Sequence, residues 1–250
     1  MKSKIETIFI FLFLLFFTLI AIYPVLNILA VSIRTDNAFQ TQSLSLIQAA
    51  EEFVDLNKNN KWDTEEPFVD LNNNGIWDAG SSIKSYVSLF TKTDFLIWAR
   101  NSIFISFLVT LTGVLFASTG GYALSRFKFK GRDFGMIALL TTQIFPATML
   151  LLPFFILLSY LGLINSYIGL IIIYSSTALP FCIWQMKGYY DTIPPSLEES
   201  ARLDGCTRFQ AFYKVILPLS RPALVITALF SFMASWSEYV VAAIILQDPK

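Results

Sequence analysis

Histidine is absent from the 250-residue sequence, cysteine occurs twice, and charged residues make up only 14% of the chain. Without histidine the chain lacks the side chain that most often acts as a general base or binds a metal near neutral pH. No G-x-x-x-x-G-K-[ST] phosphate loop occurs, which excludes ATP hydrolysis by that route. The formal net charge is zero, which argues against a nucleic-acid partner. We therefore expect a protein that is not an enzyme and holds no tightly bound cofactor.

Apolar residues, by contrast, make up 55% of the chain and aromatic residues 16%, a composition typical of a multi-pass membrane protein. A bilayer span needs about 20 residues. Five runs are long enough, at residues 8–33, 101–124, 134–160, 165–186 and 222–246. Lys2 and Lys4 precede the first run as they would a signal peptide, but its apolar core is too long, so we expect an uncleaved span. The expected fold class is an all-α polytopic membrane bundle.

These runs also contain prolines, which interrupt helical hydrogen bonding, and glycines, which reduce the side-chain bulk of a helix. Pro24, Pro146, Pro153 and Pro180 remove backbone hydrogen bonds, which implies kinks for packing or for a substrate pathway. Gly113, Gly120 and Gly121 allow close helix approach. Cys182 and Cys206 would need an oxidising cytoplasm to pair, so we expect two free thiols.

Basic residues predict the orientation of the spans. Lys2 and Lys4, the turn at 126–132 and the segment 187–221 lie in alternate loops, and short loops rich in Lys and Arg remain in the cytoplasm. The N-terminus is therefore expected to be cytoplasmic, in a bacterial plasma (inner) membrane. Five spans would then place Lys250 outside.

The cytoplasmic segment 196–222 carries its own helix signals. Ser196 with Glu199 forms one capping-box pattern and Thr207 with Gln210 forms a second. Gly205 stands between them, where a helix would end in a left-handed residue. We expect a helix-turn-helix elbow.

The second helix of this elbow should present one apolar face. Phe209, Phe212 and Ile216 follow i, i+3, i+7 spacing, and Pro218 is expected to end the helix. The face would pack against either the membrane bundle or a partner protein.

The elbow resembles the EAA loop of ABC-importer permeases, and the continuation into Pro222 and Ala223 resembles the carbohydrate-uptake, maltose-system branch. Ser200 and Val215 depart from that pattern by small steric changes, and the resemblance extends over about residues 95–246. The residues that carry it are Glu199, Ala201, Asp204, Gly205, Leu217 and Pro218. Together with the apolar face at Phe209 and Phe212, they form the set to which we assign coupling to an ATPase.

The resemblance implies several partners and a mechanism. ABC ATPase subunits would close on ATP and push the elbow as a rigid lever, switching the bundle between inward-facing and outward-facing states. A second, homologous permease subunit, an extracytoplasmic solute-binding protein and the lipid bilayer complete the expected set. The family uses a sixth span, which is expected to be missing from this sequence. The cargo implied is a sugar or oligosaccharide.

Glu238 lies within the last apolar run, where an ionisable group is costly unless it is paired or hydrated. One interpretation is an interfacial carboxylate beside an aromatic belt. The other assigns Trp236, Glu238 and Tyr239 to the substrate pathway, and similarity to the corresponding stretch of sugar permeases favours it.

A tandem repeat with a period of fifteen residues occupies the outer loop, with Phe53–Asp63 recurring as Phe68–Asp78. Oxygen ligands at alternate positions of a calcium-loop frame predict Ca²⁺ binding in preference to Mg²⁺. Asn60 and Gly75 stand where the frame needs a tight turn, and Ser81 replaces the final carboxylate of the second copy. The alternative is an Asx-rich surface loop that binds nothing tightly. The predicted metal-site positions are Asp55, Asn57, Asn59, Lys61, Asp63 and Glu66 in the first copy, and Asp70, Asn72, Asn74, Ile76 and Asp78 in the second.

These features predict three domains: an N-terminal transmembrane helix (1–33), an extracytoplasmic loop (34–94) with the repeat at 53–80, and a permease domain (95–250) with the coupling loop at 196–218. Two other functions remain open. The chain could be a permease for a non-sugar solute, or a membrane-anchored calcium-binding scaffold. Deleting residues 51–80 would separate a permease, which should tolerate the loss, from a scaffold.

Overall fold

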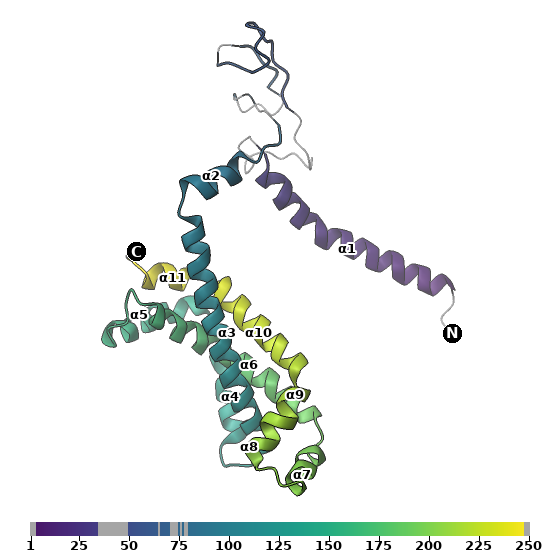
Figure 1. Ribbon diagram of the computed structural model, residues 1–250, viewed down its shortest axis with the longest axis vertical. Coiled ribbons are helices and arrows are strands. Elements are labelled where there is room, and N and C mark those ends of the chain that lie inside the picture. Colours follow the sequence, from purple (N-terminus) through teal and green to yellow (C-terminus); the bar gives the residue numbers. More distant parts are fainter. Residues whose placement is uncertain are drawn as a thin grey trace. The chain divides into compact units, whose positions relative to one another are not determined.

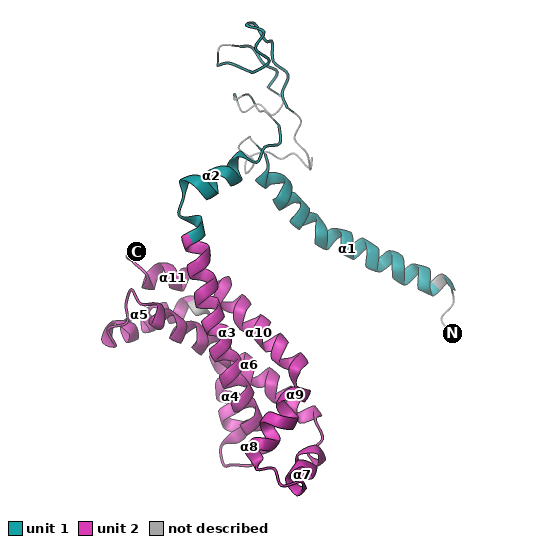
Figure 2. Ribbon diagram, viewed as in Figure 1, with its two compact units in different colours: residues 1–96 teal, residues 97–250 magenta. Residues whose placement is uncertain are grey.

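The computed structural model describes residues 4–34, 50–64, 66–70, 75, 77 and 80–247. The chain divides into two compact units, residues 1–96 and 97–250 (Figure 2). Within the described residues every regular element is helical, apart from two isolated β-bridges. The all-helical fold class is therefore confirmed.

Figure 1 labels the helices in the order in which they occur along the chain. The first unit contains α1 (Lys4–Ser32) and α2 (Lys84–Lys92), and α3 (Phe95–Arg126) begins at its end. The second unit continues with α4 (Arg132–Thr141), η1 (Thr142–Ile144), η2 (Ala147–Leu150), α5 (Leu151–Tyr160), α6 (Tyr167–Thr192), α7 (Ser196–Leu203), α8 (Arg208–Ala211), the π-helical turn η3 (Phe212–Ile216), α9 (Leu217–Leu219), α10 (Arg221–Trp236) and α11 (Val240–Ile245).

Among the described residues, three helices, α1, α3 and α6, are long and apolar enough to cross a membrane, as the runs at 8–33, 101–124 and 165–186 predicted. The run at 134–160 is instead two segments bent by 96°, Arg132–Ile144 and Thr148–Tyr160. Pro146 lies at the break, where it cannot donate a backbone hydrogen bond. A second bent pair, Arg208–Leu219 and Arg221–Trp236, meets at 78°, and counting each pair as one span gives up to five spans among the described residues.

The prediction of one continuous helix over 222–246 is wrong. Helix α10 ends at Trp236 and α11 begins at Val240. The Glu238 carboxylate accepts a hydrogen bond from the Val241 backbone N–H at 3.1 Å, which supplies an acceptor to the first turn of the new helix. A side chain that hydrogen-bonds the backbone locally therefore starts a second short helix here.

Helix α3 packs against both α6 and α10 in the second unit, and its glycines make the contacts close. A Cβ added at Gly121 would lie 2.8 Å from the Met186 Cβ and 3.0 Å from the Lys187 backbone nitrogen. A Cβ added at Gly113 would lie 2.4 Å from the Ser231 Oγ. Both helix pairs therefore depend on glycine, as the sequence predicted for Gly113 and Gly121, whereas a Cβ at Gly120 would meet Ile183 at an ordinary 3.6 Å. Cys182 and Cys206 are free thiols.

The two copies of the tandem repeat pair with each other in the first unit. Phe53 and Phe68 form an antiparallel bridge, and the Val54 N–H donates to the Pro67 carbonyl at 2.9 Å. The Trp62 and Trp77 rings stack with centroids 5.3 Å apart and planes at 18°. The aromatic residues of the repeat thus form a small core shared by both copies.

The indole N–H group of each copy donates a hydrogen bond to the backbone carbonyl of a glutamate. Trp62 Nε1 donates to the Glu66 carbonyl at 3.0 Å, and Trp77 Nε1 donates to the Glu51 carbonyl at 2.9 Å. Glu51 precedes Glu66 by one repeat period, and both side chains are buried. Glu51 therefore accepts from the tryptophan of the second copy as Glu66 accepts from the tryptophan of the first. Sequence reasoning missed this equivalence.

The segments on either side of the insert also pair. The Ser82 N–H donates to the Ile33 carbonyl at 2.6 Å, and Arg34 forms an antiparallel bridge with Ser81. The Ser32 and Tyr86 hydroxyls are hydrogen-bonded at 2.7 Å. The two ends of the insert between α1 and α2 therefore lie next to each other.

Candidate functional site

The first helix of the elbow begins without the expected capping box. Pro195 occupies the N-cap position with helical backbone angles, so Ser196 already lies inside α7. The Pro195 carbonyl accepts from the Glu198 and Glu199 N–H groups at 3.0 and 3.1 Å. The prediction of a Ser196–Glu199 cap is wrong because the preceding proline starts the helix one residue earlier.

The turn of the elbow is built as predicted. Gly205 has a φ of +88°, the left-handed conformation in which a side chain is strained. The Cys206 N–H donates to the Ala201 carbonyl at 3.0 Å and the Gly205 N–H to the Arg202 carbonyl at 3.1 Å. This pair of bonds is the Schellman motif that ends a helix at a left-handed residue.

The capping box at Thr207 is confirmed. The Thr207 hydroxyl accepts from the Gln210 N–H at 3.2 Å, and the Gln210 side chain accepts from the Thr207 N–H at 2.8 Å. Both bonds satisfy backbone donors at the start of α8. The turn between α7 and α8 is therefore fixed on both sides.

The apolar face predicted for the second helix is only partly correct. Phe212 and Ile216 are buried in the bundle, but Phe209 is 71% exposed. A π-helical turn occupies Phe212–Ile216, and its i→i+5 pattern breaks the 3.6-residue periodicity used for the prediction. The helical path also continues through Pro218 to Leu219, because proline is tolerated in the first turn of α9.

The remaining elbow residues divide between packing and exposure. Ala201 is buried and Leu217 half-buried. Leu203, which sequence reasoning did not single out, is 89% exposed beside the turn. The predicted coupling residues that are exposed are Glu199, Asp204, Gly205, Phe209 and Pro218.

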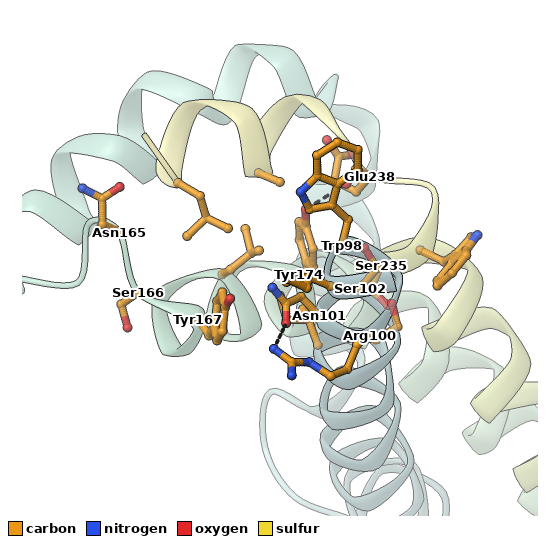
Figure 3. A pocket seen from close by; sticks show the side chains of 17 residues that line it. Trp98, Arg100, Asn101, Ser102, Asn165, Ser166, Tyr167, Tyr174, Ser235 and Glu238 are labelled. Carbon is orange, nitrogen blue, oxygen red and sulfur yellow. Dashed lines mark hydrogen bonds between the residues drawn. The ribbon is translucent and has the colours of Figure 1, made fainter. Parts of the chain in front are cut away.

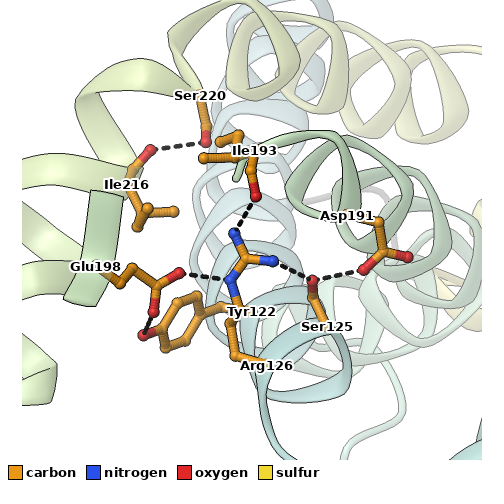
Figure 4. Close-up of polar contacts among 8 residues, drawn as sticks. All are labelled: Tyr122, Ser125, Arg126, Asp191, Ile193, Glu198, Ile216 and Ser220. Carbon is orange, nitrogen blue, oxygen red and sulfur yellow. Dashed lines mark hydrogen bonds and ion pairs between the residues drawn. The ribbon is translucent and has the colours of Figure 1, made fainter. Parts of the chain in front are cut away.

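A buried ion pair ties α7 to the end of α3 (Figure 4). The Arg126 guanidinium contacts one Glu198 carboxylate oxygen, and the Tyr122 hydroxyl donates to the other at 2.9 Å. The Arg126 and Glu198 side chains are only 12% and 14% exposed. Arg126 Nη2 also donates to the Ile193 carbonyl at 2.8 Å, just beyond α6. Sequence reasoning missed this pair, although a basic residue ending a span and a second Glu beside Glu199 were visible signals.

Polar contacts continue from this pair along α6. The Ser125 hydroxyl donates to one Asp191 oxygen at 2.6 Å, and Lys187 donates to the other at 2.6 Å. Arg126 Nη1 donates to the same Ser125 hydroxyl at 3.3 Å. The ends of α3 and α6 and the start of α7 are thus connected by one polar network.

A pocket of about 980 Å³ lies near the opposite end of the bundle (Figure 3). Its lining combines aromatic, polar and charged side chains: Trp98, Arg100, Asn101, Ser102, Ser166, Tyr167, Tyr174, Ser235, Trp236 and Glu238 are among them. The residues come from α3, the start of α6 and the region around the α10 end.

The structure brings Trp236 and Glu238 together at this pocket, whereas Tyr239 is 76% exposed and does not belong to its described lining. Glu238 caps α11 through its carboxylate, and its carbonyl accepts from the Tyr174 hydroxyl at 2.9 Å. Trp98 and Arg100 were missed, because nothing in their local spacing marks them.

The first copy of the repeat brings part of the predicted metal-site set together. One Asp63 oxygen accepts from the Asn57 and Asn59 side-chain amides at 2.6 and 2.9 Å, and the Asp55 carboxylate accepts from the Asn59 and Asn60 N–H groups. The Lys61 N–H donates to the Asn59 side chain at 2.7 Å.

Glu66 turns its carboxylate inward in the same copy. It accepts from the Leu56 and Asp63 N–H groups at 2.8 and 3.1 Å. In the second copy the Gly75 N–H donates to Asp70 at 2.7 Å. Asn60 and Gly75 have φ of +56° and +74°, as expected at the tight turn.

The structure does not gather a metal-binding cluster among these residues. In the part of the chain that is described, no group of three or more His, Cys, Asp or Glu side chains is placed to hold a metal ion. The predicted positions Asn72, Asn74, Ile76 and Asp78 lie outside the described residues.

The described residues thus combine membrane-spanning helices with a helix-turn-helix elbow, the arrangement that the EAA-loop resemblance implied. Residues 98–250 match the family described as the binding-protein-dependent transport system inner membrane component. The chain belongs to this family of ABC-importer permeases and is a multi-pass membrane subunit that is not itself an ATPase.

Individual relatives agree with this assignment. The chain is 29% identical over its whole length to the maltodextrin transport system permease protein MdxG of Bacillus subtilis, of which it covers 77%. It is 32% identical over 99% of its length to the maltose/maltodextrin transport system permease protein MalG of Escherichia coli, of which it covers 79%. A crystal structure of a bacterial ABC transporter that imports the acidic polysaccharide alginate aligns with 99% of the chain and 78% of the solved chain, with a TM-score of 0.68 and 26% identity. The resemblance to carbohydrate-uptake permeases is confirmed.

Proposed function

We propose that this chain is the permease subunit through which an ABC importer moves a sugar or oligosaccharide across a bacterial plasma membrane. The observation that carries the proposal is the Gly205 elbow within a chain whose relatives are maltodextrin and maltose permeases. ATP hydrolysis belongs to partner subunits, and a solute-binding protein delivers the cargo from outside.

The elbow is the proposed docking element for the ATPase. Leu203 and Phe209 are large apolar side chains exposed next to the Gly205 turn, and Asp204 and Glu199 add negative charge beside them. An apolar anchor surrounded by charge is the usual composition of a protein–protein contact centre. A second, homologous permease subunit would present a matching elbow to a second ATPase.

The large pocket is the proposed place where solute passes. Trp98 and Trp236 offer apolar ring faces, while Arg100, Asn101 and Glu238 offer hydrogen-bonding groups. Sugars present apolar faces and many hydroxyls, so a mixed lining of this kind suits them. Tyr239 is proposed to lie farther along the same path.

The membrane arrangement follows from the same proposal. The N-terminus is cytoplasmic, five spans cross the bilayer, and the elbow lies in the cytoplasm. The domains are an N-terminal span over 1–33, an outer loop over 34–94 and the permease domain over 95–250.

Co-purification from membranes tests the assignment. The native chain should retain its ATPase subunit, whereas an Asp204→Lys, Gly205→Val variant should lose it while remaining inserted. An Asp133→Lys variant, in the first turn of α4, is the matched control and should retain the ATPase. Failure of the native chain to retain any ATPase would overturn the coupling role.

Uptake into reconstituted vesicles tests the cargo. Labelled maltodextrin or a related oligosaccharide should accumulate in an ATP-dependent manner when the binding protein is present. Uptake of a non-sugar solute in place of every sugar tested would favour the alternative permease function.

Calcium binding by the outer repeat is a second proposal. Its support is the approach of Asp63 to Asn57 and Asn59 and the inward-facing Glu66 carboxylate. Oxygen donors of this kind suit Ca²⁺, and extracellular loops function with millimolar affinity. The ion would stiffen the insert, with binding-protein docking as a lesser role.

The stacked Trp62 and Trp77 rings make this proposal measurable by fluorescence in the full chain. Added Ca²⁺ should change the tryptophan emission of the native chain, and an Asp55→Ala, Asp63→Ala variant should not respond. An Asp94→Ala variant is the control. An unchanged native spectrum up to about 10 mM Ca²⁺, beyond the affinity range of extracellular modules, would overturn the proposal.

A further inference from the structure

The Arg126–Glu198 pair joins the elbow to the membrane bundle at a point that neither the motif nor the pocket explains. Arg126 ends α3, and Glu198 lies in the first turn of α7. Their side chains are about seven-eighths buried, yet each keeps its charge satisfied by a partner from another segment. Removing one member of a buried pair leaves the other charged and unpaired, so such a contact resists separation.

Arg126 makes this contact three-sided. It reaches Glu198 on α7, the Ile193 carbonyl beyond α6 and Ser125 on its own helix. The planar guanidinium fixes the direction of all three contacts, which the point charge of lysine could not do. One side chain thus determines where three segments lie relative to each other (Figure 4).

The connection between α6 and α7 adds stiffness to the same place. This connection contains Pro194 and Pro195, and each proline has a restricted φ. Behind them, the Tyr122 ring packs on the Phe212 ring with centroids 4.5 Å apart, which attaches the second half of the elbow to α3 as well.

We infer that Arg126 and Glu198 are positioning residues that make the elbow and the inner ends of α3 and α6 move as one body. This inference rests on the proposed coupling function. Displacement of the elbow by an ATPase would then pass directly into α3, which also lines the pocket through Trp98 and Asn101. Without the pair, the elbow would still bind the ATPase through its exposed Leu203 side. Its movement, however, would no longer be transmitted to α3, because the contact between α7 and α3 would be flexible.

The first experiment measures the joint itself, in the purified chain without partners. Hydrogen exchange of the α7 backbone amides should accelerate about tenfold or more in Arg126→Gln and in Glu198→Gln, because local opening becomes easier. The double variant should exchange no faster than either single variant, since neither charge is then left unpaired. Arg132→Gln, which removes an exposed ion pair with Asp133 at the start of α4, is the control and should leave α7 unchanged.

The second experiment measures coupling in the reconstituted complex. Arg126→Gln and Glu198→Gln should retain the ATPase but lower the number of solute molecules moved per ATP by about fivefold or more. A merely structural role would lower transport and ATP hydrolysis together, in proportion to the folded protein, and would leave this ratio unchanged.

The two experiments separate the proposals. Unchanged exchange in α7, or an unchanged transport-to-ATP ratio in a complex that retains its ATPase, would overturn the positioning role. Faster exchange combined with a native chain that binds no ATPase would instead contradict the coupling function while leaving the joint established.

Discussion

Gly113 of α3 lies directly against Ser231 of α10, so closely that a Cβ on the glycine would stand 2.4 Å from the serine Oγ. Gly113→Ala should therefore destabilise the protein by about 1–3 kcal/mol through overpacking. Ser231→Gly in the same chain should recover most of that loss, because it removes the obstructing atoms.

Thermal unfolding in detergent measures this effect. A thiol-reactive dye reports exposure of the buried Cys182 when Cys206 has been replaced by serine. Gly120→Ala, where a Cβ would meet Ile183 at an ordinary 3.6 Å, is the control and should shift the midpoint little. Equal shifts for both glycines would contradict the packing argument.

Gly205→Val should weaken coupling through the backbone alone. A Cβ there would meet nothing within 4 Å, so the cost arises from the φ of +88° and amounts to about 1–2 kcal/mol. ATPase retention and transport should both fall, with the protein still inserted. Gly205→Asn, which tolerates the left-handed region better, should be milder.

A matched control exists at Gly131, which also has a φ of +88° and open space but lies in the turn before α4. Gly131→Val should cost similar stability without uncoupling transport. If Gly205→Val transported solute undiminished, the role of the turn would be rejected.

Thr207→Ala should loosen the second elbow helix by about 1 kcal/mol, since the hydroxyl caps α8 through the Gln210 N–H. Ser196→Ala should have little effect, because Pro195 holds the N-cap position of α7. Hydrogen exchange of the α8 and α7 amides distinguishes the two substitutions. A larger effect at Ser196 than at Thr207 would contradict the assignment of the side-chain cap to α8 rather than to α7.

Glu238 allows its two roles to be separated. Glu238→Gln keeps an acceptor for the Val241 N–H, whereas Glu238→Ala removes the cap and should cost about 1 kcal/mol at the start of α11. If the carboxylate also serves the solute, both variants should raise the KM for uptake. Tyr160→Phe, at the exposed end of α5 and outside the described pocket lining, is the control and should leave KM unchanged. A native KM in Glu238→Gln would limit this residue to capping.

Much of the bundle could be predicted because apolar length alone identifies α1, α3 and α6. Gly205 and Thr207 were predictable for a similar reason, since their turn chemistry depends only on neighbouring residues. The face of Phe209 was not, because a π turn changes the helical phase without leaving a distinctive mark in the sequence.

Long-range contacts were the main omission. Arg126 and Glu198 are 72 positions apart, and only packing of α3 against the elbow brings them together. Trp98 reaches the pocket in the same way. Glu51 was more accessible, because it precedes Glu66 by the fifteen-residue period that the repeat already displays.

The pairing of Ile33 with Ser82 and of Arg34 with Ser81 gives the insert between α1 and α2 a property that a linear map of the chain conceals. Because the chain departs and returns at adjacent points, the distance from α1 to α2 does not depend on how many residues lie between them. Such a segment can be lengthened, duplicated or excised in evolution as a cassette, and its fifteen-residue tandem copies are the kind of change that this junction permits. The protein can therefore acquire a new module between α1 and α2 without any change to the helices of the second unit.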